Sequence, residues 1–227
     1  MPDEGKLSRR VLRGPDGRNA VRLPDPLLAI LGVTGLKEIL IGTYLEFVRN
    51  KIDDNKLSGF VISYNDDLTL LHHVDSDFKL HGYSIFRNSD VTSWTVFDSP
   101  DYFMNRALRL KGIRPRRPRA LDISSWRLAF ETASRNWPLF ALHREALRND
   151  VCWVGRYVDS TPKTVTLYEI SPTAEWEKPT RFRIADITRI DFGGGYEDAL
   201  WRVAEEDGPC PATGPNKRVH RSARRTL

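Results

Sequence analysis

The sequence predicts a mostly β protein of the α+β kind, built from two tandem five-stranded small barrels that each carry an associated helix. Three observations favour this class. A residue pattern recurs at a constant offset of 96 positions, turn signals occur roughly every eight to twelve residues, and amphipathic helical segments flank the β-rich runs. With 227 residues, the chain is long enough to form two modest cores.

The recurring pattern centres on the segment from Ile85 to Trp94. At the offset of 96 residues its key positions fall on the same residue types, with Phe86 on Phe182, Arg87 on Arg183, Asp90 on Asp186 and Thr92 on Thr188. The same offset places Gly59 on Gly155. Internal similarity at a fixed period indicates two copies of one supersecondary unit.

Breaker residues and charge predict how the chain is divided. We expect residues 1–25 to form a poorly ordered arm, because proline and glycine recur there without a regular apolar pattern. The first barrel and its closing helix are assigned to 26–112, and a basic linker to 113–120. A helix, the second barrel and its closing helix take 121–207, and a basic disordered tail takes 208–227.

The strands of the first copy are predicted from β-rich runs separated by turn residues. Asp53-Asp54-Asn55 and Asn65-Asp66-Asp67 provide two of the turns. Five short strands follow from this spacing: Tyr44 to Val48, Phe60 to Tyr64, Leu68 to Val74, Tyr83 to Phe86 and Val91 to Val96. Short strands at this spacing are typical of a small barrel rather than of parallel βαβ units.

A helix is predicted to close the first copy. Ser99-Pro100-Asp101 supplies a cap, a helix-opening proline and an acid in the first turn, and Gly112 can end the helix. Phe103, Ala107 and Leu110 recur at helical spacing, so we expect them to form the face that packs on the barrel.

The second copy repeats this plan. Asp122 is predicted to cap a helix with an apolar face made of Trp126, Phe130, Ala133 and Trp137. The five predicted strands are Leu139 to His143, Val151 to Val158, Thr164 to Ile170, Arg181 to Ile184 and Ile187 to Phe192. The closing helix runs from Tyr196 to Glu205, with inward side chains expected at Leu200, Val203 and Ala204.

Basic charge is concentrated outside the predicted barrels. The net charge is +5, yet residues 106–119 hold seven basic residues and no acid: Arg106, Arg109, Lys111, Arg114, Arg116, Arg117 and Arg119. Runs of this kind can bind nucleic acid or another anionic surface. A solvated linker is the alternative explanation, and it stays open on the sequence alone.

Composition also sets the expected compartment. No run approaches the roughly 18 apolar residues that predict a membrane span, so no membrane partner is expected. The N-terminus lacks the pattern of a secretory signal. Two cysteines do not make a disulfide framework, and a cytoplasmic location is therefore predicted.

The repeated Phe-Arg-x-x-Asp-Ile/Val-Thr turn resembles the second motif of Sm-like small β-barrels. The segments from Phe86 to Trp94 and from Phe182 to Ile190 both fit that frame. In that family the motif's arginine helps to line an RNA-binding pocket, which the resemblance would carry over to Arg87 and Arg183. The chain departs from the motif at its glycine and asparagine positions. The second copy is also similar to uncharacterised bacterial proteins, a similarity that implies no activity.

The repeated turn also has an explanation that needs no ligand. Asp90 or Asp186 can hydrogen-bond nearby backbone N–H groups, and the preceding arginine can pair with that carboxylate. Two further segments hold residue types found at ligand sites. The histidines around His72 and His73 make a weak metal candidate, because adjacent residues on a strand point to opposite faces. Gly193-Gly194-Gly195 lacks the lysine of a phosphate-binding loop.

The sequence therefore predicts a non-enzymatic binding protein with no cofactor, metal or catalytic residue assigned. RNA or single-stranded nucleic acid is the leading partner, and a protein-interaction or assembly module is the alternative. The predicted nucleic-acid-binding residues are Arg87, Arg183, Lys111, Arg114, Arg116, Arg117 and Arg119. Aromatic side chains can stack on bases where they are exposed, and the candidates named for this are Tyr44, Phe60, Tyr64 and Tyr83.

Overall fold

The computed structural model describes residues 41–211 of the chain. The described residues divide into two compact units: unit 1 takes 41–80 and 87–117, and unit 2 takes 81–86 and 118–211. The predicted N-terminal arm, 1–25, lies outside the described residues, as does the predicted tail from residue 212 onward.

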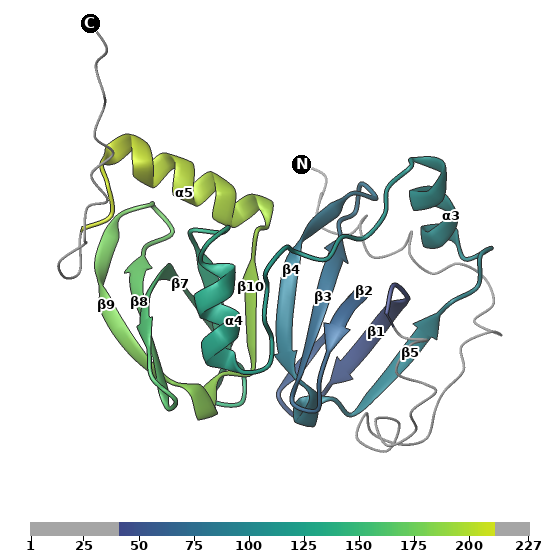
Figure 1. Cartoon of the computed structure of the whole chain (residues 1–227), viewed down its shortest axis with the longest axis horizontal. Coiled ribbons are helices and arrows are strands. Elements are labelled where there is room, and N and C mark those ends of the chain that lie inside the picture. Colours follow the sequence, from purple (N-terminus) through teal and green to yellow (C-terminus); the bar gives the residue numbers. More distant parts are fainter. Residues whose placement is uncertain (1–40, 212–227) are drawn as a thin grey trace, which may run out of the picture. The chain divides into compact units, whose positions relative to one another are not determined.

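Unit 1 is an antiparallel sheet with one helix (Figure 1). Its hydrogen-bonded strand order is β5-β1-β2-β3. The elements are β1 (Tyr44–Arg49), β2 (Asp53–Tyr64), β3 (Leu68–Val74), the 3-10 turn η1 (Asn88–Asp90), β5 (Ser93–Phe97) and α3 (Phe103–Leu110).

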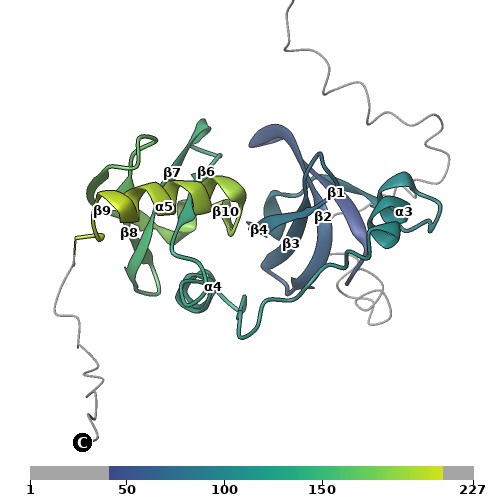
Figure 2. The same ribbon diagram turned by 90° about the horizontal axis from the view of Figure 1, so that it is seen from above.

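Unit 2 has strands in the order β4-β10-β6-β7-β8-β9, all antiparallel. It contains residues 81–86 of β4 (Leu80–Arg87). Its other elements are α4 (Trp126–Ala133), β6 (Phe140–Arg144), β7 (Arg148–Ser160), β8 (Thr164–Ile170), β9 (Trp176–Arg183), η2 (Ile184–Asp186), β10 (Arg189–Phe192) and α5 (Gly195–Asp207). Figure 2, seen from above, shows α5 lying across the strands of this unit.

The mostly β class is confirmed, since ten strands and three α-helices make up the described residues. The predicted closure of each copy into a five-stranded barrel is not established by these strand orders, which are open. Closure into two tandem barrels therefore stays a prediction.

The element bounds of the two copies coincide at the offset seen in the sequence. Leu68–Val74 corresponds residue for residue to Thr164–Ile170, and Leu80–Arg87 to Trp176–Arg183. Close backbone approach explains the shared glycine. A Cβ built at Gly59 would lie 2.7 Å from the carbonyl oxygen of His72, and one at Gly155 would lie 2.6 Å from that of Tyr168. The internal repeat stays a prediction, and these matching bounds and glycines agree with it.

Each unit has an aromatic-rich core. In unit 1, Leu45, Phe47, Leu71 and Trp94 are buried. In unit 2, the predicted apolar face of α4 is buried through Trp126, Phe130 and Ala133, and the Phe130 ring lies 5.3 Å from that of Phe140. A second cluster joins α5 to the sheet through Leu139, Ile170, Ala174, Leu200 and Ala204.

Two helix details differ from the sequence prediction in unit 2. Ser125, and not Asp122, caps α4, because the Ser125 hydroxyl accepts a hydrogen bond from Leu128 N at 3.3 Å. The Asp122 carboxylate instead accepts from Ser124 N in the preceding turn. In α5 Leu200 and Ala204 face inward as predicted, whereas Val203 is 49% exposed.

The packing face of α3 differs more. Met104 and Leu108 are buried, and the residues predicted to pack include Phe103 at 65% and Leu110 at 80% exposure. The spacing of four and three residues fits either face of this helix. Met104 and Leu108 form the buried face, and two large apolar side chains remain exposed.

Candidate nucleic-acid interface

The basic segment 106–119 is exposed at every one of its charged positions: Arg106, Arg109, Lys111, Arg114, Arg116, Arg117 and Arg119. Two of these arginines lie on α3, and the others follow in backbone that is neither helix nor strand. Pro115 and Pro118 prevent that backbone from continuing the helix. All but Arg119 belong to unit 1.

Most of these charges lack a carboxylate neighbour. Within residues 41–211, no ion pair joins an acid to Arg106, Arg109, Lys111, Arg114, Arg117 or Arg119. Three arginines of unit 2 behave differently. Arg127, Arg148 and Arg202 contact Glu131, Asp150 and Asp198, respectively, at 3.1, 3.1 and 2.8 Å. The 106–119 segment therefore concentrates unneutralised positive charge.

Hydrogen bonds hold the segment against unit 1. Lys111 Nζ donates to Asp77 O at 2.6 Å, and Arg116 N donates to Nδ1 of His72 at 3.2 Å. His72 is 6% exposed, and burial, reinforced by the charges of His73 and Arg116, lowers its pKa to about 4. The ring is therefore neutral near pH 7 and able to accept that hydrogen bond.

The repeated turns hold their arginines through local ion pairs. In unit 2, Nε and Nη2 of Arg183 each lie 2.8 Å from a carboxylate oxygen of Asp186, although the Arg183 side chain is 74% exposed. In unit 1, Arg87 Nε lies 4.0 Å from Asp90 Oδ2, and its side chain is only 26% exposed. The guanidinium of Arg183 is already engaged in a bidentate contact, the same geometry with which arginine binds phosphate.

The aromatic residues named from the sequence as stacking candidates lie inside or half inside the sheets. Tyr44 and Phe60 are each 7% exposed, and Tyr64 and Tyr83 are half-buried. They pack with neighbours, as Tyr44 does with Phe60 at 5.3 Å between ring centroids. They do not present a free ring face for a base.

A different aromatic pair lies beside the basic segment. Phe103 and Phe78 pack edge to face at 5.2 Å, and Lys111 Nζ lies 5.7 Å from the centroid of the Phe78 ring. Sequence reasoning missed both residues, because Phe103 was assigned to the core and Phe78 lies in a turn. A signal was present: at the offset of 96 residues they fall on Ala199 and Ala174, so both differ between the copies.

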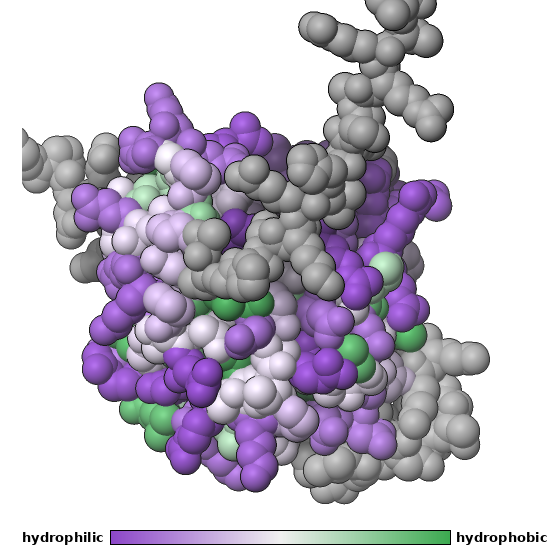
Figure 3. All heavy atoms as spheres, turned by 60° about the vertical axis from the view of Figure 1, so that its left-hand side comes forward, coloured by the Kyte–Doolittle hydropathy of each residue, from purple (hydrophilic) through white to green (hydrophobic). Residues whose placement is uncertain are grey.

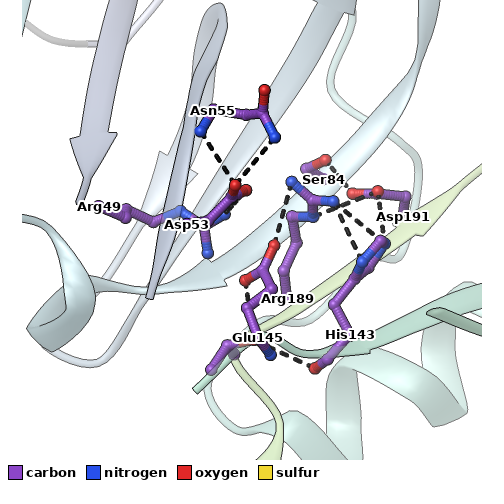
Figure 4. Close-up of polar contacts among 9 residues, drawn as sticks. Arg49, Asp53, Asn55, Ser84, His143, Glu145, Arg189 and Asp191 are labelled. Atoms are coloured by element: carbon purple, nitrogen blue, oxygen red, sulfur yellow. Dashed lines mark hydrogen bonds and ion pairs between the residues drawn. The ribbon is translucent and has the colours of Figure 1, made fainter. Parts of the chain in front are cut away.

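A separate polar cluster surrounds Arg189 on β10 of unit 2 (Figure 4). Arg189 contacts Glu145 at 3.4 Å and Asp191 at 3.3 Å, and its Nη2 lies 3.1 Å from Nδ1 of His143. The Asp191 carboxylate also accepts from the hydroxyl of Ser84 on β4 and lies 2.9 Å from His143 Nε2. The cluster thus ties β4, β10 and β6 together.

This cluster lacks the order of groups that activates a serine. In a hydrolase the histidine lies between the serine and the acid and removes the hydroxyl proton. Here the carboxylate of Asp191 lies between Ser84 and His143, and the serine hydroxyl donates to it. The arrangement is that of a structural ion network. Figure 4 also shows a similar contact in unit 1, where buried Arg49 lies 3.4 Å from Asp53.

The histidine cluster and the glycine run were the remaining candidate sites from the sequence. Among the described residues no group of three or more His, Cys, Asp or Glu side chains is placed to hold a metal ion. At the glycine run, a Cβ on Gly194 would lie 2.6 Å from Oε2 of Glu197, and one on Gly193 would meet the Trp137 ring at 2.5 Å. The protein's own carboxylate therefore lies where an anion would bind.

Comparison with known proteins found no matching family model, curated protein or solved structure. Among the described helices, none combines the length and the apolar character needed to cross a bilayer. The face drawn in Figure 3 is mainly hydrophilic, with hydrophobic residues in small patches.

Proposed function

We propose that the protein is a non-enzymatic nucleic-acid-binding protein that contacts RNA or another single strand through residues 106–119. One observation carries this proposal: seven basic side chains are exposed within one short segment, and six of them have no carboxylate partner among residues 41–211. Phosphate contacts supply most of the affinity in sequence-independent binding, so unpaired lysine and arginine are the groups required.

The geometry of the segment suits a flexible strand. A short helix carries Arg106 and Arg109, and backbone that is neither helix nor strand carries the charges that follow. Contacts from Lys111 and Arg116 to the body of unit 1 reduce the freedom of that backbone before a ligand arrives. Less conformational entropy is then lost on binding than for an untethered linker.

The turn arginines receive a smaller role in this proposal. Arg183 makes a bidentate contact with Asp186, and Arg87 is largely covered. A phosphate would have to displace the carboxylate of Asp186 or approach close to it, which is unfavourable. The resemblance of these turns to the Sm-like motif keeps them as candidates for a secondary contact.

A triple charge substitution tests the proposal. Arg106→Gln, Arg109→Gln and Arg114→Gln together remove three exposed charges of unit 1 and keep helix-compatible side chains. The matched control is Arg127→Gln, Arg148→Gln and Arg202→Gln, which makes the same net charge change at paired arginines, of which Arg148 and Arg202 are exposed and Arg127 is half-buried. Fluorescence anisotropy with a labelled oligouridine at low salt measures the affinity of each.

We predict that the unit 1 triple variant binds at least tenfold more weakly than wild type, because about three phosphate contacts are lost. The control variant should retain most of the affinity. No binding of oligouridine by wild type at low salt, or an equal loss in both variants, would overturn the proposal.

A second candidate function is partner recognition through strand edges. Among the described strands β5 pairs with β1 alone and β9 with β8 alone, so each has an edge with unpaired backbone groups. The β9 edge carries Glu177, Lys178 and Pro179, features that discourage strand addition. We therefore rank this function second. Light scattering tests it: a defined oligomer that persists in the unit 1 triple variant would favour assembly.

A further inference from the structure

Exposed Phe103 and half-buried Phe78 form an aromatic pair on unit 1, adjoining the basic segment. The rings pack edge to face at 5.2 Å, and 65% of Phe103 remains exposed. Phe103 lies one helical turn from Arg106, and Leu110, at 80% exposure, lies on the same side of α3. Bulky apolar side chains normally face the core on such a helix. Leaving Phe103 and Leu110 exposed to water therefore has a cost in free energy.

The turn that carries Phe78 is unusual for so large a residue. Phe78 has φ of 56°, a left-handed conformation that bulky side chains rarely adopt. Its turn is held by Asp75, whose Oδ1 accepts from Asp77 N at 2.9 Å and from Lys79 N at 2.8 Å. The corresponding turn of unit 2 places Ala174 at φ of 66°. A small residue such as alanine is accommodated more easily at this left-handed φ, yet unit 1 has a phenylalanine at the position.

The second copy provides an internal comparison for α3. The inward positions are apolar in both helices, with Met104 and Leu108 corresponding to Leu200 and Ala204. Arg106 corresponds to Arg202, but four other outward positions differ between the copies. Phe103, Arg109, Leu110 and Lys111 correspond to Ala199, Glu205, Glu206 and Asp207. Unit 1 therefore has aromatic, apolar and basic side chains where unit 2 has a small residue and three acids, although the packing requirement is the same.

We propose that Phe103, braced by Phe78, is a stacking platform for an unpaired base, and that Arg106, Arg109 and Lys111 contact the phosphates on either side. The site rests on the proposed function and deepens it, because stacking requires a strand with accessible bases. Base–aromatic stacking depends little on sequence, since every base has a π-face. The ligand class is therefore single-stranded RNA or DNA, and not duplex.

Charge and size favour this ligand over the alternatives. Asp77, the residue before Phe78, is paired with Lys79 at 3.4 Å, which offsets part of its negative charge. An anionic membrane would also attract the arginines, yet α3 has eight residues and exposes only two large apolar side chains. Peripheral helices that bind bilayers bury a much longer apolar face.

The test uses the full chain and three labelled probes: an oligouridine, a duplex of the same length, and an abasic oligomer that keeps the phosphates but has no bases. Phe103→Ala removes the ring, and Phe103→Trp keeps an aromatic at that position. Tyr196→Ala is the matched control, because it removes an aromatic ring that is 54% exposed on α5 of unit 2. Vesicles of phosphatidylcholine and phosphatidylglycerol serve as the membrane probe.

We expect Phe103→Ala to weaken oligouridine binding by roughly tenfold, in line with the loss of one stacked base, and to leave abasic binding unchanged. Phe103→Trp and Tyr196→Ala should bind like wild type. Equal oligouridine affinity for wild type and Phe103→Ala would overturn the platform. So would a Phe103→Ala variant that loses as much affinity for the abasic oligomer as for oligouridine. Binding that depends on Phe103 only with vesicles, and not with nucleic acid, would also overturn it. If the proposed function itself is wrong, the result differs: the wild-type protein then binds none of the nucleic-acid probes.

Discussion

Phe78 and Ala174 occupy the same position in two turns that share one backbone conformation, with φ of 56° and 66°. Their surroundings differ. Ala174 is 4% exposed and belongs to the cluster beneath α5, whereas Phe78 supports the exposed ring of Phe103. One scaffold thus carries a packing residue in unit 2 and a surface aromatic in unit 1, which is the difference that our functional proposal explains.

Phe78→Gly should separate stability from binding. Glycine adopts a left-handed φ freely and relieves about 1 kcal/mol of strain, while the lost aromatic contact costs about the same. We predict that the free energy of unfolding changes by less than about 1 kcal/mol and that oligouridine binding weakens. Urea unfolding and anisotropy measure the two quantities.

Ala174→Gly is the control for that substitution, because it makes the same backbone change in unit 2. It should leave oligouridine affinity unchanged. A loss of more than about 3 kcal/mol of stability in Phe78→Gly would show instead that the ring is part of the core, since that is the cost of truncating a buried aromatic.

Gly59→Ala should strongly destabilise the sheet of unit 1. The added Cβ would lie 2.7 Å from the His72 carbonyl oxygen, so β2 and β3 would have to move apart. We predict a loss of about 2 kcal/mol or more in the free energy of unfolding, measured in urea.

Gly112→Ala provides the comparison, because a Cβ there has no neighbour within 4 Å and meets only the strain of φ at 67°. Its predicted cost is about 1 kcal/mol. If Gly59→Ala were as mild as this, the close approach of the two strands would not constrain that position.

Acid should destabilise unit 1 through His72. Its folded pKa is lowered to about 4 from the ordinary 6.5, so the unfolded chain binds this proton more readily. Stability is therefore unaffected above pH 6.5 and falls as the pH decreases from 6.5 toward 4. The predicted loss from this group is at most about 3 kcal/mol, measured by urea unfolding across that range.

His72→Leu is the control for this pH dependence. It removes the titrating group, so the slope of stability between pH 6.5 and pH 4 should become shallower. An unchanged slope would mean that other groups cause the acid sensitivity. The hydrogen bond from Arg116 N is also lost in this variant, so only the slope, and not the absolute stability, is compared.

Local patterns were sufficient to predict most strands. Leu68–Val74 and Thr164–Ile170 were predicted to the residue, because Asn, Asp, Thr and Pro turns bound them. β9 begins at Trp176 and not at the predicted Arg181, because Glu177, Lys178 and Pro179 resemble a loop. Charges and proline are tolerated there because β9 is an edge strand, and sequence alone does not reveal which strands are edges.

The sequence predicted the basic charge of the candidate site but not which aromatic side chains lie at its surface. The exposed basic residues of 106–119 follow directly from composition, and the contact between Arg183 and Asp186 follows from their spacing. The aromatic platform does not, because helical periodicity alone cannot show which face of α3 the sheet covers. Only the packing of Met104 and Leu108 identifies Phe103 as a surface residue.

The salt dependence of oligouridine binding tests the central claim most directly. Each phosphate contact contributes about 0.7 to the slope of log affinity against log salt for a single strand. We predict that the variant with Arg106→Gln, Arg109→Gln and Arg114→Gln has a slope smaller by about 2 than wild type. The variant with Arg127→Gln, Arg148→Gln and Arg202→Gln should keep the wild-type slope. Equal slopes in all three proteins would contradict binding through residues 106–119.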